Sequence, residues 1–349
     1  MQDDRSIFMR RCLELASNGA GNVSPNPLVG AVLVHENKII GEGWHQKIGE
    51  AHAEVNAIDM AVKNGFSNVL SRSELFVSLE PCSHYGKTPP CTELIIKHNI
   101  QKVTIGCRDP FPEVNGKGIK YLQEAGVTVE ENLLSDECKI MNRRFITFHT
   151  KKRPFIILKF AQSGDHYLAP LPGKSGKISN DYSDKLVHRW RSEEDAILVG
   201  TKTAALDNPR LTVRNWTGRN PVRLTIDRLL KLPVDLHLFD SSAPTLIFNN
   251  IKDEQSGSVE FIKINFDENV LNQILNRLYS RNIQSLIVEG GKNVLQQFID
   301  QSLWDEARII TAEKKFGDGI KSPDIPGRVI SSDNIHGDVI TILKPIFAD

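Results

Sequence analysis

One stretch of this chain, residues 51–92, contains an imidazole, a carboxylate and two thiols in an order that suits a zinc site. His52 and Glu54 come before a predicted strand, and Cys82 and Cys91 follow it. Zinc prefers neutral imidazole and thiolates, and three protein ligands leave a fourth position for a water that the metal acidifies. The stretch therefore predicts an open zinc site with His52, Cys82 and Cys91 as ligands. A packing role for the same side chains is the alternative.

Glu54 lies two positions after His52, which is a poor spacing for two ligands on one face of a helix. Its carboxylate can instead reach the water that the metal carries, so we expect a proton shuttle. The pattern is typical of zinc nucleobase deaminases, whose two cysteines are separated by two residues. Here eight residues separate them. Thr88 can cap a helix with Pro89 at its first position, which places Cys91 in the first turn, where the thiolate is favoured.

Charge narrows the choice of substrate. The chain has 43 Lys plus Arg and 43 Asp plus Glu, so it lacks the overall positive charge typical of proteins that bind nucleic acid. This balance weighs against a deaminase that edits tRNA or DNA, although it does not exclude a local basic patch. We expect no nucleic-acid partner.

Targeting signals are also missing from the sequence. The start of the chain is acidic and lacks the basic and apolar regions of a secretory signal, and no apolar run has the length of a membrane span. Five cysteines are an odd number in a chain of 349 residues, which favours reduced thiols. We interpret Cys12, Cys107 and Cys138 as packing residues. The sequence therefore predicts a cytoplasmic protein without a membrane partner.

The predicted elements form two α/β domains, residues 1–150 and 151–349, because a charged cluster before Pro154 interrupts the pattern. In the first domain, Val55, Ile58 and Val62 should face a sheet, and Ile140 and Phe145 should point inward from a helix over residues 135–148. Alternating strands and helices build a layer with its site at the strand carboxyl ends. The expected helices cover residues 7–18, 52–62, 92–98, 116–125 and 135–148, and the expected strands cover residues 28–34, 38–44, 75–79, 102–106 and 127–130.

The second domain repeats this alternation. Strands are expected at 155–160, 196–200, 222–227, 245–249, 261–264 and 285–288, and helices at 182–191, 268–280 and 294–299. Between the last strand and the last helix lie Gly290 and Gly291, which would let backbone N–H groups approach a phosphate at a helix N-terminus. A plain tight turn is the alternative.

Three segments carry a more specific resemblance: NPLVG at residues 26–30, GEGWH at residues 41–45 and PCSHYGKTPPC at residues 81–91. They resemble the riboflavin-biosynthesis deaminase-reductases, and the resemblance covers nearly the whole chain, more loosely in its second half. It implies a cytidine-deaminase-like α/β/α domain followed by a dihydrofolate-reductase-like α/β domain. It also implies Zn²⁺, NADPH, a small phosphorylated pyrimidine as substrate, and a homo-oligomer.

The resemblance further implies a set of site residues. For the pyrimidine it implies Asn26, His45, His84 and Lys87 in the first domain, and Ser175, Arg191, Leu211, Arg214 and Glu289 in the second. For NADPH it implies Ala161, Lys177, Thr203, Asp207, Gly291, Lys292, Asn293, Val294, Leu295, Gln296 and Gln297. Lys87 and the two histidines could meet a phosphate, and Arg191 and Arg214 could clamp one.

Two segments depart from the family pattern. Asp165 is followed by His166 in place of glycine, and KISN at residues 177–180 replaces a tryptophan motif that forms an apolar wall of the cofactor site. Lys177 could pair with a cofactor phosphate instead. The leading hypothesis is a deaminase joined to a reductase. The alternative is a zinc nucleotide or tRNA deaminase with a C-terminal binding domain that has no activity.

Overall fold

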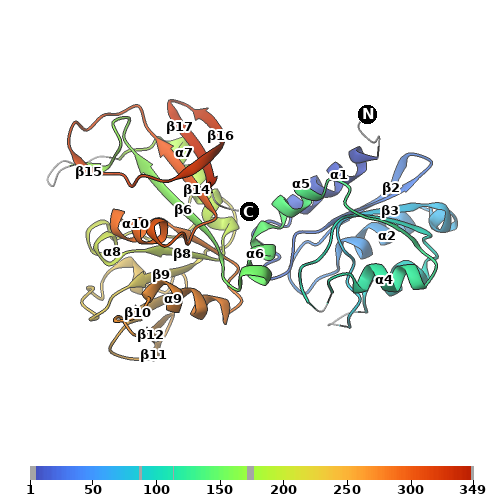
Figure 1. Cartoon of the computed structure of the whole chain (residues 1–349), viewed down its shortest axis with the longest axis horizontal. Coiled ribbons are helices and arrows are strands. Elements are labelled where there is room, and N and C mark those ends of the chain that lie inside the picture. The colour runs from blue at the N-terminus through green and yellow to red at the C-terminus, as the bar shows by residue number, and fades with distance from the viewer. Residues whose placement is uncertain (1–4, 86–88, 113, 171–176, 347–349) are drawn as a thin grey trace. The chain divides into compact units, whose positions relative to one another are not determined.

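The computed structural model describes residues 5–85, 89–112, 114–170 and 177–346. The chain divides into two compact units, Met1–Lys151 and Lys152–Asp349 (Figure 1). None of the described helices has the length and apolar content that crossing a lipid bilayer requires.

Unit 1 is built on a five-stranded sheet with the order β2-β1-β3-β4-β5. β1 pairs antiparallel with β2 and with β3, whereas β3, β4 and β5 are parallel, so their carboxyl ends share one edge. The strands are β1 (Gly30–His35), β2 (Lys38–Trp44), β3 (Glu74–Leu79), β4 (Lys102–Cys107) and β5 (Thr128–Glu130).

Helices cover both faces of this sheet. Ile58 and Ala61 of α2, Ile95 of α3 and Leu122 of α4 pack on one face, and α1 and α5 pack on the other. The fold is therefore the α/β/α arrangement that the family resemblance implies. The helices are α1 (Ser6–Ser17), α2 (Ala53–Lys63), α3 (Cys91–Lys97), α4 (Lys117–Glu124), α5 (Ser135–Met141) and α6 (Arg143–Lys151), with a 3₁₀ turn at Ser67–Arg72.

The helix predicted over residues 135–148 is in fact two helices that meet at Asn142. The side chain of Asn142 is 2% exposed, accepts from the Leu28 N–H at 2.8 Å and donates to the Leu28 carbonyl at 2.9 Å. This tertiary contact breaks the helix, and no local signal reports it. The inward predictions for Ile140 and Val62 are also wrong, since both side chains are exposed, whereas Ile58 and Phe145 are buried as predicted.

Two helix starts differ from the prediction at the zinc stretch. α3 begins at Cys91 with Pro90 as its N-cap, so Pro89 is not its first residue, but Cys91 does lie in the first turn. His52 is not a helical residue, because its backbone is extended and it is the N-cap of α2. His52 therefore lies just outside α2, and Glu54 is the second residue of this helix.

Unit 2 is built on a ten-stranded sheet with the order β11-β12-β10-β9-β8-β13-β6-β14-β17-β16. The central run from β12 to β14 is parallel, and β11, β17 and β16 add antiparallel edges. Its strands are β6 (Phe155–Gln162), β8 (Ala196–Val199), β9 (Val222–Ile226), β10 (Thr245–Asn249), β11 (Glu254–Ser256), β12 (Val259–Lys263), β13 (Ser285–Val288), β14 (Glu306–Thr311), β16 (Gly327–Ile335) and β17 (Asp338–Pro345).

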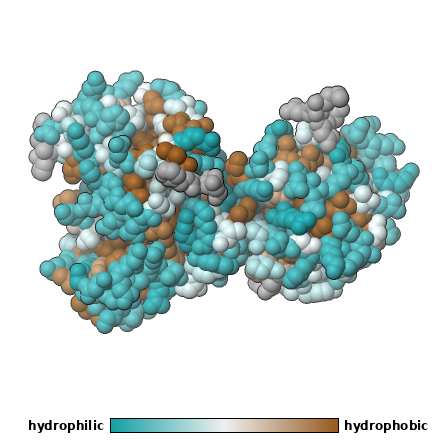
Figure 2. All heavy atoms as spheres, in the orientation of Figure 1, coloured by the Kyte–Doolittle hydropathy of each residue, from teal (hydrophilic) through white to brown (hydrophobic). Residues whose placement is uncertain are grey.

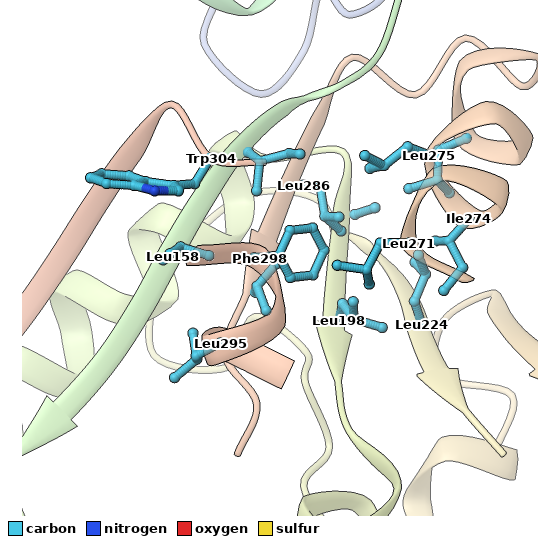
Figure 3. Close-up of a cluster of buried hydrophobic side chains, with 14 of the residues drawn as sticks. Leu158, Leu198, Leu224, Leu271, Ile274, Leu275, Leu286, Leu295, Phe298 and Trp304 are labelled. Atoms are coloured by element: carbon cyan, nitrogen blue, oxygen red, sulfur yellow. The ribbon is translucent and has the colours of Figure 1, made fainter. Parts of the chain in front are cut away.

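The core of unit 2 lies on both faces of this sheet. On one face, Leu275 of α9 and Phe298 of α10 pack with strand residues such as Leu158 (Figure 3). On the other face, Val187 and Trp190 of α7 pack with Ala204 of α8. These helices are α7 (Asp181–Glu193), α8 (Thr201–Asp207), α9 (Val270–Tyr279) and α10 (Lys292–Asp300), and a small sheet pairs β7 (Tyr167–Pro170) with β15 (Gly319–Lys321).

The hydrogen bonds between the Asn142 side chain and the Leu28 backbone can be tested by mutation. We expect Asn142→Ala to lower the free energy of unfolding of unit 1 by about 1–3 kcal/mol, because the Leu28 N–H and carbonyl lose their buried partner. Thermal unfolding and hydrogen exchange of residues 26–34 would measure the effect. Unchanged protection of this segment would contradict the role assigned to Asn142.

Candidate active sites

The structure brings the three predicted zinc ligands together at the carboxyl edge of the sheet in unit 1. Nδ1 of His52 lies 3.6 Å from Sγ of Cys82 and 3.3 Å from Sγ of Cys91, and the three ligand atoms all lie within 4.8 Å of one another. His52 precedes α2, Cys82 follows β3, and Cys91 begins α3. The end of one strand and the starts of two helices therefore supply one ligand each.

These separations fit a zinc ion. Zn–S bonds of about 2.3 Å and Zn–N bonds of about 2.0–2.1 Å in a tetrahedron place sulfur and nitrogen roughly 3.6 Å apart. A hydrogen bond from Cys91, supported by His52, outweighs burial and lowers the pKa of the Cys82 thiol well below its usual value. Zinc binds the thiolate, which the lowered pKa of Cys82 favours, and the spacing of the three ligand atoms fits this metal.

Glu54 lies in the first turn of α2 beside this cluster. Its side chain is 3% exposed, and burial, followed by the charge of Cys82, raises the pKa of its carboxyl. A carboxyl that is buried next to a metal site can both take and return a proton. Its position is the one that the predicted proton shuttle requires.

His45 and Asn26 form a second polar group in unit 1. The Nδ1 atom of His45 lies 3.1 Å from the Ala51 carbonyl, and its Nε2 lies 3.0 Å from Nδ2 of Asn26. Burial lowers the pKa of His45, so its ring is neutral at pH 7 and can accept from the Asn26 amide. His45 therefore orients the amide of Asn26. The phosphate contact of His45 stays a prediction.

The other predicted pyrimidine contacts of unit 1 lie on the loop between the cysteines. His84 is exposed, and its ring is 6.3 Å from that of Phe111, which also packs on His149 at 5.0 Å. Lys87 lies outside the described residues, as do Thr88 and Ser175. Phe111 and His149 come from segments that the sequence analysis did not connect with the site.

A buried charged cluster marks the corresponding edge of unit 2. Arg191 donates to both carboxylate oxygens of Glu289, at 2.9 and 2.7 Å, and Lys159 lies 3.7 Å from the same carboxylate. Burial opposes the charge of Glu289, but Arg191 and Lys159 outweigh it and lower the pKa of its carboxyl to about 2. The guanidinium fork of Arg191 is therefore directed to Glu289 in this structure. Its role as a phosphate clamp stays a prediction.

Lys159 was missed by the sequence analysis. Its signal was a lysine inside the otherwise apolar strand β6, at a position where burial also lowers the pKa of its ammonium group. Arg214, by contrast, keeps an exposed side chain while its N–H donates to Nδ1 of His188 at 3.0 Å. Burial and the charges of Arg191 and Arg214 lower the pKa of His188 to about 4. The ring of His188 is therefore neutral at pH 7.

Several predicted cofactor residues meet where β8 and β13 end. Gly291 has a φ of +45° and is the N-cap of α10, and a Cβ on it would lie 2.9 Å from Oγ1 of Thr203. A Cβ on Gly200 would likewise lie 2.7 Å from Cγ2 of Val294. The two turns are in close contact, so Thr203, Gly291 and Val294 share one edge of the sheet. Ala161, Asp207, Lys292, Asn293, Gln296 and Gln297 lie on β6, α8 and α10.

Three of the predicted residues have other roles in the structure. Leu295 is buried in the core that Figure 3 shows, and its N–H is bonded to the Gly291 carbonyl, so neither group is available to a cofactor. Leu211 is also a core residue, so only its backbone could contact a substrate. The ammonium group of Lys177 pairs with Asp181 at 2.5 Å and with Asp184 at 2.6 Å. These carboxylates compete with the cofactor phosphate that we expected Lys177 to bind.

Comparison with known families agrees with this division of the chain. The cytidine and deoxycytidylate deaminase zinc-binding region matches residues 2–107, and the RibD C-terminal domain matches residues 154–329. Riboflavin biosynthesis protein RibD of Aquifex aeolicus is 37% identical over 93% of this chain and 91% of its own length. That of Bacillus amyloliquefaciens is 38% identical over 91% of this chain and 86% of its own length.

Solved structures show the same likeness across both units. The crystal structure of a diaminohydroxyphosphoribosylaminopyrimidine deaminase/5-amino-6-(5-phosphoribosylamino)uracil reductase from Thermotoga maritima superposes with a TM-score of 0.90 at 38% identity, over 97% of this chain and 98% of that one. RibD of Acinetobacter baumannii superposes with a TM-score of 0.87 at 28% identity, over the same shares of the two chains.

The zinc cluster can be tested by its cysteines. We expect the protein to bind about one equivalent of zinc, and Cys82→Ser and Cys91→Ser to lose most of it, because each removes one of three ligands. Cys107→Ser is the matched control, since this cysteine is buried on β4 and is not part of the cluster. Metal analysis of the purified proteins measures the outcome. Full zinc content in both ligand variants would show that the site is assigned to the wrong residues.

Proposed function

Because the chain belongs to the RibD family of riboflavin biosynthesis proteins, we propose that unit 1 carries its deaminase activity and unit 2 its reductase activity. The protein is a bifunctional enzyme that uses zinc and NADPH. Its proposed substrate is 2,5-diamino-6-ribosylamino-4(3H)-pyrimidinone 5′-phosphate, which it deaminates before reducing the ribosyl group to a ribityl chain.

The observation that carries the proposal for unit 1 is the convergence of His52, Cys82 and Cys91 beside the buried carboxyl of Glu54. Zinc bound there supplies a water that is acidic enough to attack at neutral pH. Glu54 takes a proton from the attacking water and delivers it to the ring nitrogen of the pyrimidine. Glu54 would then take the proton of the hydroxyl group added to the ring carbon and pass it to the amine, so that the C–N bond breaks, ammonia leaves and a carbonyl forms.

The charged cluster of unit 2 supports the second step. NADPH supplies the hydride, and the protein has to hold the ribosyl carbon and the nicotinamide in line. We propose that the turn at Gly291 receives a cofactor phosphate, because its N–H groups lie at the start of α10. Glu289, fixed by Arg191 and Lys159, then offers a carboxylate for the hydroxyl groups of the sugar. The guanidinium of Arg214 donates to Thr212 through Nη1, and its other nitrogens can meet the substrate phosphate.

We also propose that the enzyme is a cytoplasmic homo-oligomer. All five cysteines are free thiols, as expected for a reducing compartment. β16 is an edge strand whose Val329 and Ile330 are exposed, and Figure 2 shows apolar side chains over this part of unit 2. An exposed apolar edge strand is a common site of pairing with a second chain.

Glu54→Gln tests the deaminase mechanism. The amide keeps the size and hydrogen bonding of the carboxylate but cannot accept a proton at neutral pH, so deamination should fall by roughly 10²-fold or more while zinc stays bound. Asp59→Asn, on the exposed side of the same helix, should leave deamination unchanged. Ammonia release and zinc content measure the two effects. If the Glu54 variant lost its zinc, Glu54 would be a ligand and not a shuttle.

Gly291→Asp tests the reductase site. The new side chain would meet Thr203, adopt a backbone conformation that is unfavourable for it, and place a negative charge where a cofactor phosphate is expected. Reduction of the deaminated intermediate, which is measured as NADPH consumption, should vanish, while ammonia release should persist. Gly291→Ala introduces the strain without the charge and should lose less NADPH affinity. If the wild-type protein deaminates but never consumes NADPH, unit 2 is a binding domain.

A further inference from the structure

Glu80 is a buried carboxylate that the reaction described above does not use. It lies between the end of β3 and Cys82, and its side chain accepts four backbone N–H groups from a segment far along the chain. Oε2 accepts from Asp109 at 3.3 Å and from Gly116 at 2.9 Å. Oε1 accepts from Gly118 at 3.0 Å and from Ile119 at 3.4 Å. These hydrogen bonds hold the backbone of Asp109 and of residues 116–119 against the strand end that leads to Cys82.

Two of these donors, the N–H groups of Gly118 and Ile119, lie in the first turn of α4, where a helix offers its own N–H groups no carbonyl partner. A helix N-terminus is usually capped by the side chain of its own N-cap residue. Here the N-cap is Gly116, which has no side chain, and Glu80 supplies the cap from another element. The negative charge of Glu80 also lies at the positive end of the α4 dipole. Strand β3 and helix α4 are thus joined by one side chain.

The backbone next to Glu80 is packed just as closely. A Cβ on Gly118 would lie 2.2 Å from the Pro81 carbonyl oxygen and 3.2 Å from Oε1 of Glu80. Glycine is therefore required for this contact, because any side chain would push residues 80–82 away from α4. On the opposite side, the Cys82 carbonyl accepts from both the N–H and Oγ1 of Thr92, each at 3.2 Å. Cys82 is held between the first turns of α3 and α4.

We propose that Glu80 is a positioning residue for the zinc site, which fixes the Cys82 thiolate by anchoring its backbone to the start of α4. The inference rests on the zinc site proposed above. Glu80 touches neither the ion nor the substrate, and it acts through Pro81 and Cys82. Because a metal site tolerates only small displacements of a ligand, loss of this anchor should be felt at the metal and not only in the stability of unit 1.

Glu80→Gln is the first variant that tests this role. Its amide turns N–H groups toward two N–H donors, so one half of the anchor becomes repulsive while the volume is conserved. Gly118→Ala disturbs the same contact from the other side and leaves Glu80 intact. We expect both variants to bind zinc at least about tenfold more weakly, measured by competition with a chelator. We also expect both to change the visible absorption of the cobalt-substituted protein.

Leu122→Ala is the matched control. This residue lies on the same helix and in the core, so its truncation destabilises unit 1 without touching the segment around Cys82. It should lower the unfolding temperature but leave the zinc affinity and the cobalt spectrum unchanged. NADPH-dependent reduction by unit 2 checks that each chain is otherwise intact.

The possible outcomes separate this inference from the proposed function. Zinc affinity and cobalt spectra that stay at wild-type values in both anchor variants would overturn the role of Glu80 while leaving the zinc site in place. An equal change in Leu122→Ala would also overturn it, because general destabilisation would then explain the effect. If Glu80→Gln does not fold, Gly118→Ala decides. A wild-type protein without zinc would contradict the proposed function itself.

Discussion

The geometry of unit 1 depends on how the backbone around Cys82 is held by hydrogen bonds. Two thiolates repel each other, so other interactions of the chain have to hold them and the imidazole close enough to bind one cation. The first turn of α3 binds the Cys82 carbonyl and places Cys91 beside Cys82, with the Cys91 N–H donating to the Cys82 sulfur at 3.3 Å. The metal ligands thus extend local backbone structure, and parallel pairing of β3 with β4 aligns the strand end that leads to Cys82.

Unit 2 holds a buried carboxylate in place with two cationic side chains, and its described residues include no cluster of metal ligands. Glu289 is surrounded by the cations of Arg191 and Lys159, and burial would favour a neutral carboxyl if those cations were absent. A carboxylate that is charged and also shielded from water interacts strongly with a sugar hydroxyl. In both units, candidate site residues follow the carboxyl end of a parallel strand, Cys82 after β3 and Glu289 after β13, and turns and helix starts lie there as well.

Much of this arrangement could be predicted from the sequence, because metal ligands follow rules of residue type and spacing. His52, Cys82 and Cys91 were found in that way, as was the turn at Gly291. The signals that failed were tertiary. Asn142 divides a helix through a contact with Leu28, and the pairing of Arg191 with Glu289 joins residues 98 positions apart. Strands β14, β16 and β17 were missed because they join the sheet through the pairing of β14 with β6, far back in the chain, which no local pattern records.

The position of β6 in the sheet means that this strand can pair only after later parts of the chain have been synthesised. β6 is the first strand of unit 2, yet it pairs with β13 and β14, whose residues are synthesised more than a hundred positions later. Contacts of such long range slow folding, and domains fold largely in the order in which they leave the ribosome. Unit 1 can therefore be complete while the apolar segment Phe155–Gln162 still has no partner. Apolar strand residues that stay exposed in this way make a nascent chain prone to aggregation.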